Sequence, residues 1–390
     1  MPATHPRTPA ALLAAPALAL ALALAGCTEA AAAAEPAPAG EAAYRGRMLE
    51  MTDEEADPVK VWNSKGETVL APFQLTKKGL ALLDGEFSLR LEGGRYSTAG
   101  AEEHLAANLR NAAGELTISA YVYPEALESK GRGCIIGYAP KDGGFLFALT
   151  QQKNELRFSI AAPKPVEISL AELDSKKPFH LALTVSRKEI VFYRDGKKAG
   201  THPGIAGDFS AWKPGRLYFG NDEKGSCPWR GKIERAALYN RALSAGEVGK
   251  AAKSVLELIA DRGPVERIEL VGKLLERSTY RMPWGENTYR EALAECDYQV
   301  VKVTRGEYEG KKIRVAELMF VDRIFLTNSR KQVGKEYRLV VEELDGNLRM
   351  AKVERGLLDP DMDLILYVEM SPLEALPADQ QPKPGKKSEK

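Results

Sequence analysis

Three aromatic residues are the main candidates for ligand contact in this chain. Trp212 lies in the loop 209–215, where its ring has good prospects of exposure, and Tyr121 and Tyr123 share one face of a predicted strand. Aromatic faces pair with the apolar faces of sugar rings, and their polar groups add hydrogen bonds. We therefore predict that these residues bind carbohydrate. Core packing is the alternative for Trp212, and the tyrosines would line a groove on a concave sheet but be solvated on a convex one.

A second pair of residues suggests a cation site. Asn221 and Asp222 follow a predicted strand, and hard cations such as calcium prefer several carboxyl and carbonyl oxygens. Calcium is therefore a candidate cofactor at this pair, with a plain turn as the alternative. The segment 359–370 opens with alternating aspartates but has Leu364 and Met370 where an EF-hand needs glycine and glutamate, so it does not fit that pattern.

The sequence contains no arrangement that is typical of catalysis. It lacks the HExxH, CxxC, GxSxG and P-loop motifs. Glycosidases on lectin-like sandwiches place two acids on the same face of one strand, whereas Glu234 is alone on its strand face. His180 lies between Phe179 and Leu181 and is expected on the polar surface of a strand. We predict no catalytic residue and expect a protein that is not an enzyme.

The net charge and the cysteine count limit the classes of partner and the possible disulfides. The 390 residues include 55 Lys and Arg against 54 Asp and Glu, a formal net charge of +1. Nucleic-acid binders normally carry a clear basic excess, so no nucleic acid is expected. Apart from Cys27 the chain has Cys134, Cys227 and Cys296, an odd number that leaves at least one thiol free or paired between molecules. A bond between Cys134 and Cys227 and a reduced Cys134 in the core are both open.

The first residues have the pattern of an export signal. Arg7 precedes an apolar run from Ala10 to Ala25, which is shorter than the roughly 20 residues of a membrane span. The run ends in Leu-Ala-Gly-Cys27, which resembles the bacterial lipobox, and this resemblance implies a signal peptide over 1–26 and a lipidated Cys27. An ordinary secretory signal with a chance cysteine is the alternative.

The residues after Cys27 predict a tether and a location. The stretch 28–43 is rich in Ala, Pro and Glu, so we expect a flexible tether over 27–55. In bacterial lipoproteins an Asp after the cysteine retains the protein at the inner membrane. Thr28 stands there instead, and the resemblance therefore implies the cell envelope and the outer membrane.

Short alternating strands dominate the residues from 56 to 244. Apolar residues recur at every second position, the pattern of strands with one buried face. Asp195-Gly196 lies between two such runs and predicts a type I′ hairpin turn. The predicted strands are Leu116–Tyr123, Phe145–Leu149, Leu156–Ile160, Phe179–Val185, Ile190–Arg194, Leu217–Phe219 and Ile233–Tyr239. Such a series indicates an all-β sandwich or barrel.

Three segments of this region resemble a known family. Trp229–Ser244 is similar to the closing signature of laminin-G-like, concanavalin A-like jelly rolls. Thr117–Pro124 resembles an early strand of that family, and Phe179–Lys197 resembles its central hairpin. The resemblance covers about residues 56–250 and implies a jelly-roll sandwich that binds a glycan or a protein. Glu234 stands where the family usually has Asp, so a role for that carboxylate is not carried over.

A helix and a second β domain are expected after the sandwich. Ser244 and Glu247 have the spacing of a capping box, and apolar residues then recur at helical spacing up to Gly263-Pro264. We predict a linker helix over 245–263 that packs on the sandwich. Five further strands and their turns predict a small barrel over 264–370, and the Pro- and Lys-rich tail 371–390 is expected to be disordered.

Parts of the predicted barrel resemble secreted OB-type domains. Val300–Gly306, Lys311–Val315 and Val333–Leu339 are similar to segments of netrin-like and metalloproteinase-inhibitor domains, although the cysteines of that family are absent. The region also shows a likeness to accessory domains of polysaccharide O-acetylation systems. The fold expected for the whole chain is therefore a concanavalin A-like sandwich, a short helix and a small OB-like barrel.

These features together predict a lipid-anchored binding protein of the cell envelope. The leading hypothesis is non-catalytic recognition of a polysaccharide or glycan by the laminin-G-like domain. A protein-interaction or scaffolding lipoprotein that docks a cell-envelope protein is the first alternative. An accessory role in surface polysaccharide modification is the second. In each case the membrane is reached through the N-terminal lipid.

Overall fold

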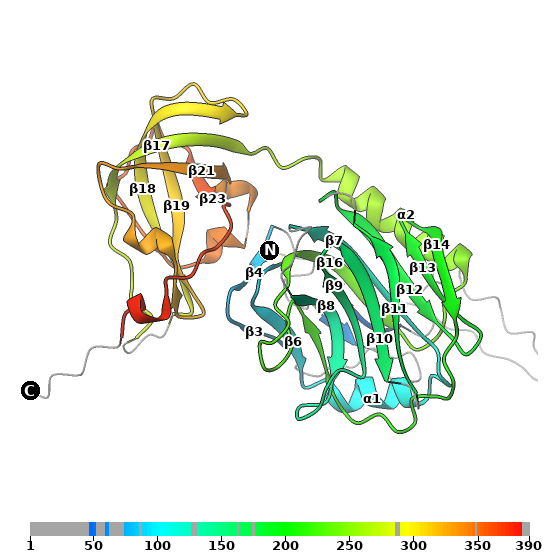
Figure 1. Cartoon of the computed structure of the whole chain (residues 1–390). Helices are drawn as coiled ribbons and strands as arrows, with labels where there is room; N and C mark the ends of the chain where they lie inside the picture. Colours follow the sequence, from blue (N-terminus) through cyan, green and yellow to red (C-terminus); the bar gives the residue numbers. More distant parts are fainter. Residues whose placement is uncertain are drawn as a thin grey trace, which may run out of the picture.

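The computed structural model describes residues 47–51, 59–61, 74–85, 88–125, 131–161, 164–173, 176–284, 289–347 and 349–383. Within them, two β domains follow one another along the chain, and a helix runs along the outside of the first (Figure 1). The predicted signal peptide 1–26 and Cys27 lie outside the described residues, as does the tether up to residue 46.

The first domain is a sandwich of two sheets. Seven strands of its first sheet run in the order β14 (Lys197–Pro203), β13 (Glu189–Arg194), β12 (Phe179–Val185), β7 (Leu116–Pro124), β16 (Arg230–Tyr239), β1 (Arg47–Met51) and β2 (Val59–Val61). Two more strands, β5 (Ser88–Glu92) and β4 (Ala81–Asp84), join this sheet through β16. The second sheet runs β11 (Pro165–Glu172), β10 (Glu155–Ala161), β9 (Phe147–Gln152), β8 (Arg132–Ala139), β15 (Arg216–Phe219), β6 (Arg95–Ala99) and β3 (Gln74–Lys78), and the helix α1 (Glu102–Arg110) follows β6.

Alternation along the strands builds the core between the two sheets. On β7, Leu116, Ile118, Ala120 and Val122 all point into one apolar cluster, together with Phe147 of the opposite sheet. The predicted hairpin at Asp195-Gly196 is also present, because both residues have positive φ, 51° and 76°. The structure thus confirms the predicted jelly-roll sandwich, and the outer face of β7 is left for the tyrosines.

The sandwich begins earlier than the sequence indicated. The segment β1, Arg47–Met51, falls inside the predicted tether 27–55, yet it pairs antiparallel with β16 and buries Met48 and Leu49. The boundary at residue 56 is therefore wrong. A short strand next to an Ala- and Pro-rich stretch has too few alternating positions to be recognised from the sequence.

The helix α2 (Ala245–Asp261) closes part of the outer face of the first sheet. Ser244 caps its first turn, and the side chain of Glu247 bonds back to the amide of Ser244. Val248 packs against Ala182, Tyr193 and Tyr239 of the sheet. The predicted helix that packs on the sandwich is confirmed, and it ends beside the second domain (Figure 1).

The second domain is a closed barrel of five strands. β17 (Ile268–Arg277) pairs with β18 (Glu291–Arg305), which pairs with β19 (Lys312–Val321), then β23 (Leu366–Glu369), β21 (Glu336–Glu343) and β17 again. The pairing of β19 with β23 is parallel, and the order agrees with the predicted OB-like barrel. The short strands β20 (Ile324–Phe325) and β22 (Arg355–Gly356) extend the sheet, and one-turn helices lie at η2 (Thr327–Arg330), η3 (Leu344–Gly346), η4 (Met350–Lys352) and η5 (Ala378–Gln380).

The first part of the tail packs on this barrel. Leu373 and Leu376 are buried, and the Gln381 side chain donates to the carbonyls of Phe325 and Leu376 at 3.1 and 2.8 Å. The prediction of disorder is therefore wrong for residues 371–383, because two leucines among the prolines have an apolar surface to cover. Residues 384–390 lie outside the described residues.

The two domains share a buried contact. Leu82 of β4 lies in one apolar cluster with Leu318 and Val368 of the barrel. The guanidinium of Arg90 donates to the carbonyl oxygens of Met370 and Ser371 at 3.3 and 2.6 Å. Side chains from both domains therefore hold β4 and β5 against the barrel, and grooves form along this boundary.

Candidate functional site

A cavity of about 750 Å³ lies between the two domains, among the residues that the structure describes. Its walls come from the outer face of β7 and β16, the end of α2, the linker after it, and the barrel residues near Glu342 and Gly346. Ligand pockets usually enclose about 300–1,000 Å³ and combine apolar surface with a few polar groups. The cavity therefore has the size of a small-ligand site.

Tyr121 and Tyr123 form the aromatic wall of this cavity. They lie two positions apart on β7, and their rings meet edge to face with centroids 5.0 Å apart. Tyr121 is 6% exposed, and its hydroxyl makes no hydrogen bond with any residue that the structure describes. Burial raises the pKa of both phenols, and Glu234 raises that of Tyr123 further, so both hydroxyls stay protonated at neutral pH. Tyr123 already hydrogen-bonds to Glu234, so the Tyr121 hydroxyl is the one that can donate to a ligand.

A bulge on β16 follows Glu234, the acidic residue beside these rings. Glu234 pairs in register with Tyr121, and the register then shifts before Ala237 while Arg235 adopts φ 50°. The extra residue lets Glu234 and Ala237 both face outward, while Ala236 points into the core. Strand alternation therefore puts Glu234 on the cavity side of the sheet, and the bulge returns Ala237 to that same face.

The end of α2 supplies the partner of Glu234. Arg262, the C-cap residue, donates to the Glu234 carboxylate. Gly263 has φ 70° and Pro264 follows it, so the helix stops there and the chain turns toward the barrel. This stop fixes the Arg262 guanidinium over the cavity wall.

A second ion pair lies within the sandwich at the cavity, and a hydrogen bond links it to the barrel. Lys232 of β16 contacts Asp84 of β4, and the amide of Asn347 in the barrel donates to the same carboxylate at 2.7 Å. Burial would raise the pKa of Asp84, but the charges of Lys232 and Arg90 outweigh it and hold the pKa below its ordinary value. Asp84 is therefore a charged link between the domains rather than a proton donor.

Glu125 differs from the other acids of the cavity. Its carboxylate makes no hydrogen bond or ion pair with any described residue, whereas Asp84, Glu234 and Glu342 are each bonded to a basic side chain. Burial and the neighbouring Glu92 raise its pKa. The cavity thus presents one unengaged carboxyl group and one unengaged tyrosine hydroxyl beside two aromatic rings.

Trp212 does not belong to this site. Its ring is 5% exposed, stacks on Phe209 with centroids 4.2 Å apart, and donates from Nε1 to the carbonyl of Ala161 at 2.8 Å. The expectation that Trp212 is exposed is wrong, because the loop folds back over the edge of the core. Its indole N–H is already satisfied inside the domain, so the packing alternative describes this residue.

Asn221 and Asp222 form a turn through their own side chains. The Asn221 Oδ1 accepts from the amides of Asp222 and Cys227 at 2.9 and 3.0 Å, and Asp222 accepts from the Ser226 amide at 2.7 Å. These oxygens are therefore engaged within the loop. In the part of the chain that the structure describes, no group of three or more His, Cys, Asp or Glu side chains is placed to hold a metal ion.

The remaining sequence candidates are also buried. Cys134, Cys227 and Cys296 are free thiols, and the first two are neighbours, because the amide of Cys134 donates to the carbonyl of Cys227 at 2.8 Å. His180 lies on the outer face of the sheet but is fully buried, and its Nε2 lies 2.9 Å from the Ser119 hydroxyl. The expectation of a surface histidine is wrong, because α2 and the Asp195 turn cover that face.

Sequence reasoning missed most residues of the cavity, among them Asp84, Glu125, Lys232 and Arg262. For two of these residues, the sequence contained a pattern that could have indicated their position. Lys232 lies two positions before Glu234, so strand alternation puts both on one face, and Arg262 closes a helix that was expected to pack on that sheet. Asp84 and Glu125 follow only from the docking of the second domain.

The similarity of this chain to solved structures is weak. No curated protein matches the sequence. Among solved structures, the botulinum neurotoxin serotype D/C binding domain is 12% identical with a TM-score of 0.43, over 77% of this chain and 74% of its own. The Trypanosoma rangeli sialidase is 17% identical with a TM-score of 0.38, over 54% of this chain and 33% of its own.

The family comparison covers most of the sandwich. The matching model is that of the concanavalin A-like lectin/glucanases superfamily, over residues 96–249. This range contains β7, β16, the hairpin at Asp195-Gly196 and the signature 229–244, which carried the resemblance in the sequence. Residues 96–249 therefore carry the similarity to the concanavalin A-like lectin/glucanases superfamily, and the barrel lies outside the match.

Proposed function

We propose that this chain is a lipid-anchored binding protein of the cell envelope that recognises a glycan in the cavity between its two domains, without catalysing a reaction. The observation that carries the proposal is the pair Tyr121 and Tyr123, whose rings line a cavity of about 750 Å³. The similarity of residues 96–249 to a lectin and glucanase superfamily supports it but does not choose a ligand.

Binding would use the unengaged groups of the cavity. A sugar ring can lie against the tyrosine rings, and contacts of this kind contribute about 0.5–1.5 kcal/mol beyond the area they bury. The Tyr121 hydroxyl and the Glu125 carboxyl can bond sugar hydroxyls without breaking an existing bond. Meanwhile the pairs Glu234–Arg262 and Asp84–Lys232 hold the walls in place.

The location rests on the N-terminal segment. The signal 1–26, the lipidated Cys27 and Thr28 after it support export to the envelope and attachment at the outer membrane. Among the described residues, no helix combines the length and apolarity that a membrane crossing requires. Attachment through a lipid and a tether would leave both domains in the aqueous phase.

One observation favours a protein partner as the second candidate. The loop 357–365 of the barrel exposes Leu357, Met362 and Ile365, and Met362 is 94% exposed. Apolar side chains on a projecting loop are typical of contact surfaces between proteins. A scaffolding role would use this loop, whereas glycan recognition would use the cavity.

A glycan binding screen on the full chain, with and without calcium, tests the proposed function. Saturable binding should fall about threefold to tenfold in Tyr121→Phe and Tyr123→Ala, because each removes a contact worth about 1 kcal/mol. Tyr218→Phe is the matched control, because Tyr218 lies on the second sheet, away from the cavity, and its hydroxyl bonds to Glu223. Absence of binding to any glycan, or equal losses in all three variants, would rule out the cavity as a glycan site.

A further inference from the structure

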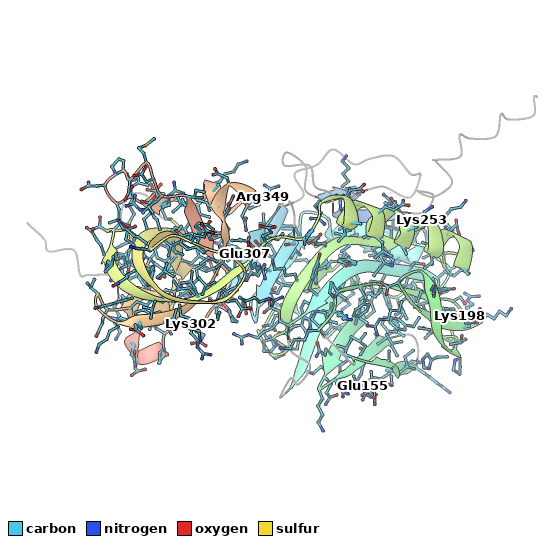
Figure 2. The ribbon with its side chains drawn as sticks, turned by 90° about the horizontal axis from the view of Figure 1, so that it is seen from above. Glu155, Lys198, Lys253, Lys302, Glu307 and Arg349 are labelled. Atoms are coloured by element: carbon cyan, nitrogen blue, oxygen red, sulfur yellow. The ribbon has the colours of Figure 1, made fainter. Side chains whose placement is uncertain are left out.

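A second groove of about 560 Å³ lies along the same domain boundary. Its residues come from β3, β4 and β6 of the sandwich, from the start of β18, and from η4 and the residues after it. It shares no lining residue with the cavity that contains Tyr121 and Tyr123. Figure 2 shows Arg349, one of its residues, on the barrel side of the boundary.

The floor of this groove is apolar with one polar exception. Leu75, Leu83, Met350 and Val353 contribute the apolar surface. Tyr96 lies among them, is 4% exposed, and its hydroxyl makes no hydrogen bond with any described residue. Burial raises the pKa of this phenol, so the hydroxyl is a donor at neutral pH. This hydroxyl is therefore available to a ligand in the groove.

Basic side chains outnumber acidic ones around this floor. Lys77, Arg290, Arg349 and Lys352 line the groove, against Glu291 and Glu354. Lys77 pairs with Glu291, and Arg290 pairs with Asp322 while it also donates to the Lys77 carbonyl at 3.0 Å. These bonds connect sandwich and barrel, so the groove has walls that are fixed before a ligand arrives.

Lys77 lies close to a second positive charge. Burial and, after it, the charge of Arg290 lower the pKa of Lys77 to about 8, against a smaller opposing effect of Asp322. Arg349 and Lys352 add positive charge from the barrel side. An anionic group in the groove would gain charge-assisted hydrogen bonds, which are stronger than neutral ones.

We propose that this groove is a second ligand site that binds an acidic saccharide, one that carries carboxylate or sulfate groups on its rings. The apolar floor would take the C–H face of a ring, the Tyr96 hydroxyl would donate to it, and Lys77, Arg349 and Lys352 would bind the anionic group. The inference rests on the proposed function only in taking the ligand to be a saccharide.

Calorimetric titration of the full chain tests the proposal with three probes: oligogalacturonate, a heparin-derived oligosaccharide and a neutral cello-oligosaccharide. An acidic probe should bind with an affinity that falls about tenfold in the double variant Arg349→Ala and Lys352→Ala. Tyr96→Phe should weaken the same probe about threefold, because the ring stays and only the donor is lost.

The control is the double variant Lys198→Ala and Lys253→Ala, which removes the same charge from the far end of the sandwich (Figure 2). Equal losses in the two double variants would mean general charge attraction and would overturn the inference, as would acidic binding that neither groove variant changes. Binding of the neutral probe alone would overturn this inference but leave the proposed function standing. No binding of any of the three probes would overturn this inference, while the glycan screen decides the proposed function separately.

Discussion

Two polar regions of this molecule are similarly buried but bonded in different ways. Inside the barrel, Lys331 bonds to Glu317 at 2.9 Å and to Glu369 at 3.3 Å, while Tyr298 also donates to Glu317. In the cavity between the domains, Tyr121 is buried and its hydroxyl has no partner among the described residues. The first region is bonded mainly to itself, and the second presents a donor to an open space.

A buried polar group that is bonded within the protein can be assigned to stability, whereas one that has no partner can be assigned to ligand binding. A buried charge that loses its partner is costly, so the barrel cluster should govern stability. A donor that bonds nothing in the free protein contributes little to stability and remains available to a ligand. The same side-chain type, tyrosine, therefore has opposite roles at positions 298 and 121.

The largest effect is expected from removing the cation of the barrel cluster. Lys331→Met leaves Glu317 and Glu369 close together without a counter-charge, so the free energy of unfolding should fall by about 3–5 kcal/mol in urea denaturation. The control is Lys312→Met, which breaks more exposed pairs with Asp297 and Asp361 and should cost about 1 kcal/mol or less. Similar losses of stability in both variants would show that the barrel cluster of Lys331, Glu317, Glu369 and Tyr298 contributes no more to stability than an exposed ion pair.

The next effect is expected at the link between the domains. Asp84→Ala leaves Lys232 and Asn347 without their shared acceptor. The free energy of unfolding should therefore fall by about 2–3 kcal/mol. Asp84→Asn keeps the shape and one acceptor and should recover part of this loss. If Asp84→Ala unfolds at the same urea concentration as the native chain, the domains are not held by this contact.

The barrel cluster also predicts a pH dependence. Burial and the charge of Glu369 raise the pKa of Glu317 from 4.5 to about 7. A carboxyl group whose pKa is raised on folding favours the folded state at low pH, so stability should fall as the pH rises from about 4.5 to 7. We expect a decrease on the order of 1–3 kcal/mol across this range, measured by urea denaturation.

The matched variants isolate this carboxyl group from the others. Glu317→Gln cannot ionise and should remove most of that slope, while Glu269→Gln, in an exposed pair with Arg305, should leave it unchanged. A native chain whose stability is flat between these pH values would contradict the assignment of the cluster.

The smallest effect on stability is expected at the cavity. Tyr121→Phe removes a hydroxyl that bonds no described residue, so the free energy of unfolding should change by less than about 0.5 kcal/mol. Tyr298→Phe removes a donor to Glu317 and should cost about 1–2 kcal/mol in the same assay. Equal costs for the two tyrosines would remove the contrast on which the assignment rests.

The sequence predicted the parts of the fold that depend on local pattern. Alternation located β7, β12 and β16, the Asp-Gly pair located a hairpin, and Ser244 with Glu247 located the start of α2. The short strand β1 and the packing of Leu373 and Leu376 were missed, because β1 pairs with the distant strand β16 and the leucines share clusters with distant residues such as Leu318 and Phe325.

The candidate site was predictable only in part. Tyr121 and Tyr123 could be named because two aromatic residues share the outer face of one strand. Whether that face is open or covered depends on where α2 ends and how the barrel docks, and neither is a local property. For the same reason Trp212 was expected in solvent, although its loop closes over the core.

Hydrogen exchange of the full chain, with and without a saturating glycan that the binding screen selects, tests whether a ligand binds in the cavity between the domains. We expect the ligand to slow exchange in residues 121–125, at the end of β7, and in residues 259–265, around the end of α2, because both segments line the cavity. Protection confined to the second sheet, or to the barrel loop 357–365, would contradict it and move the binding site to another surface.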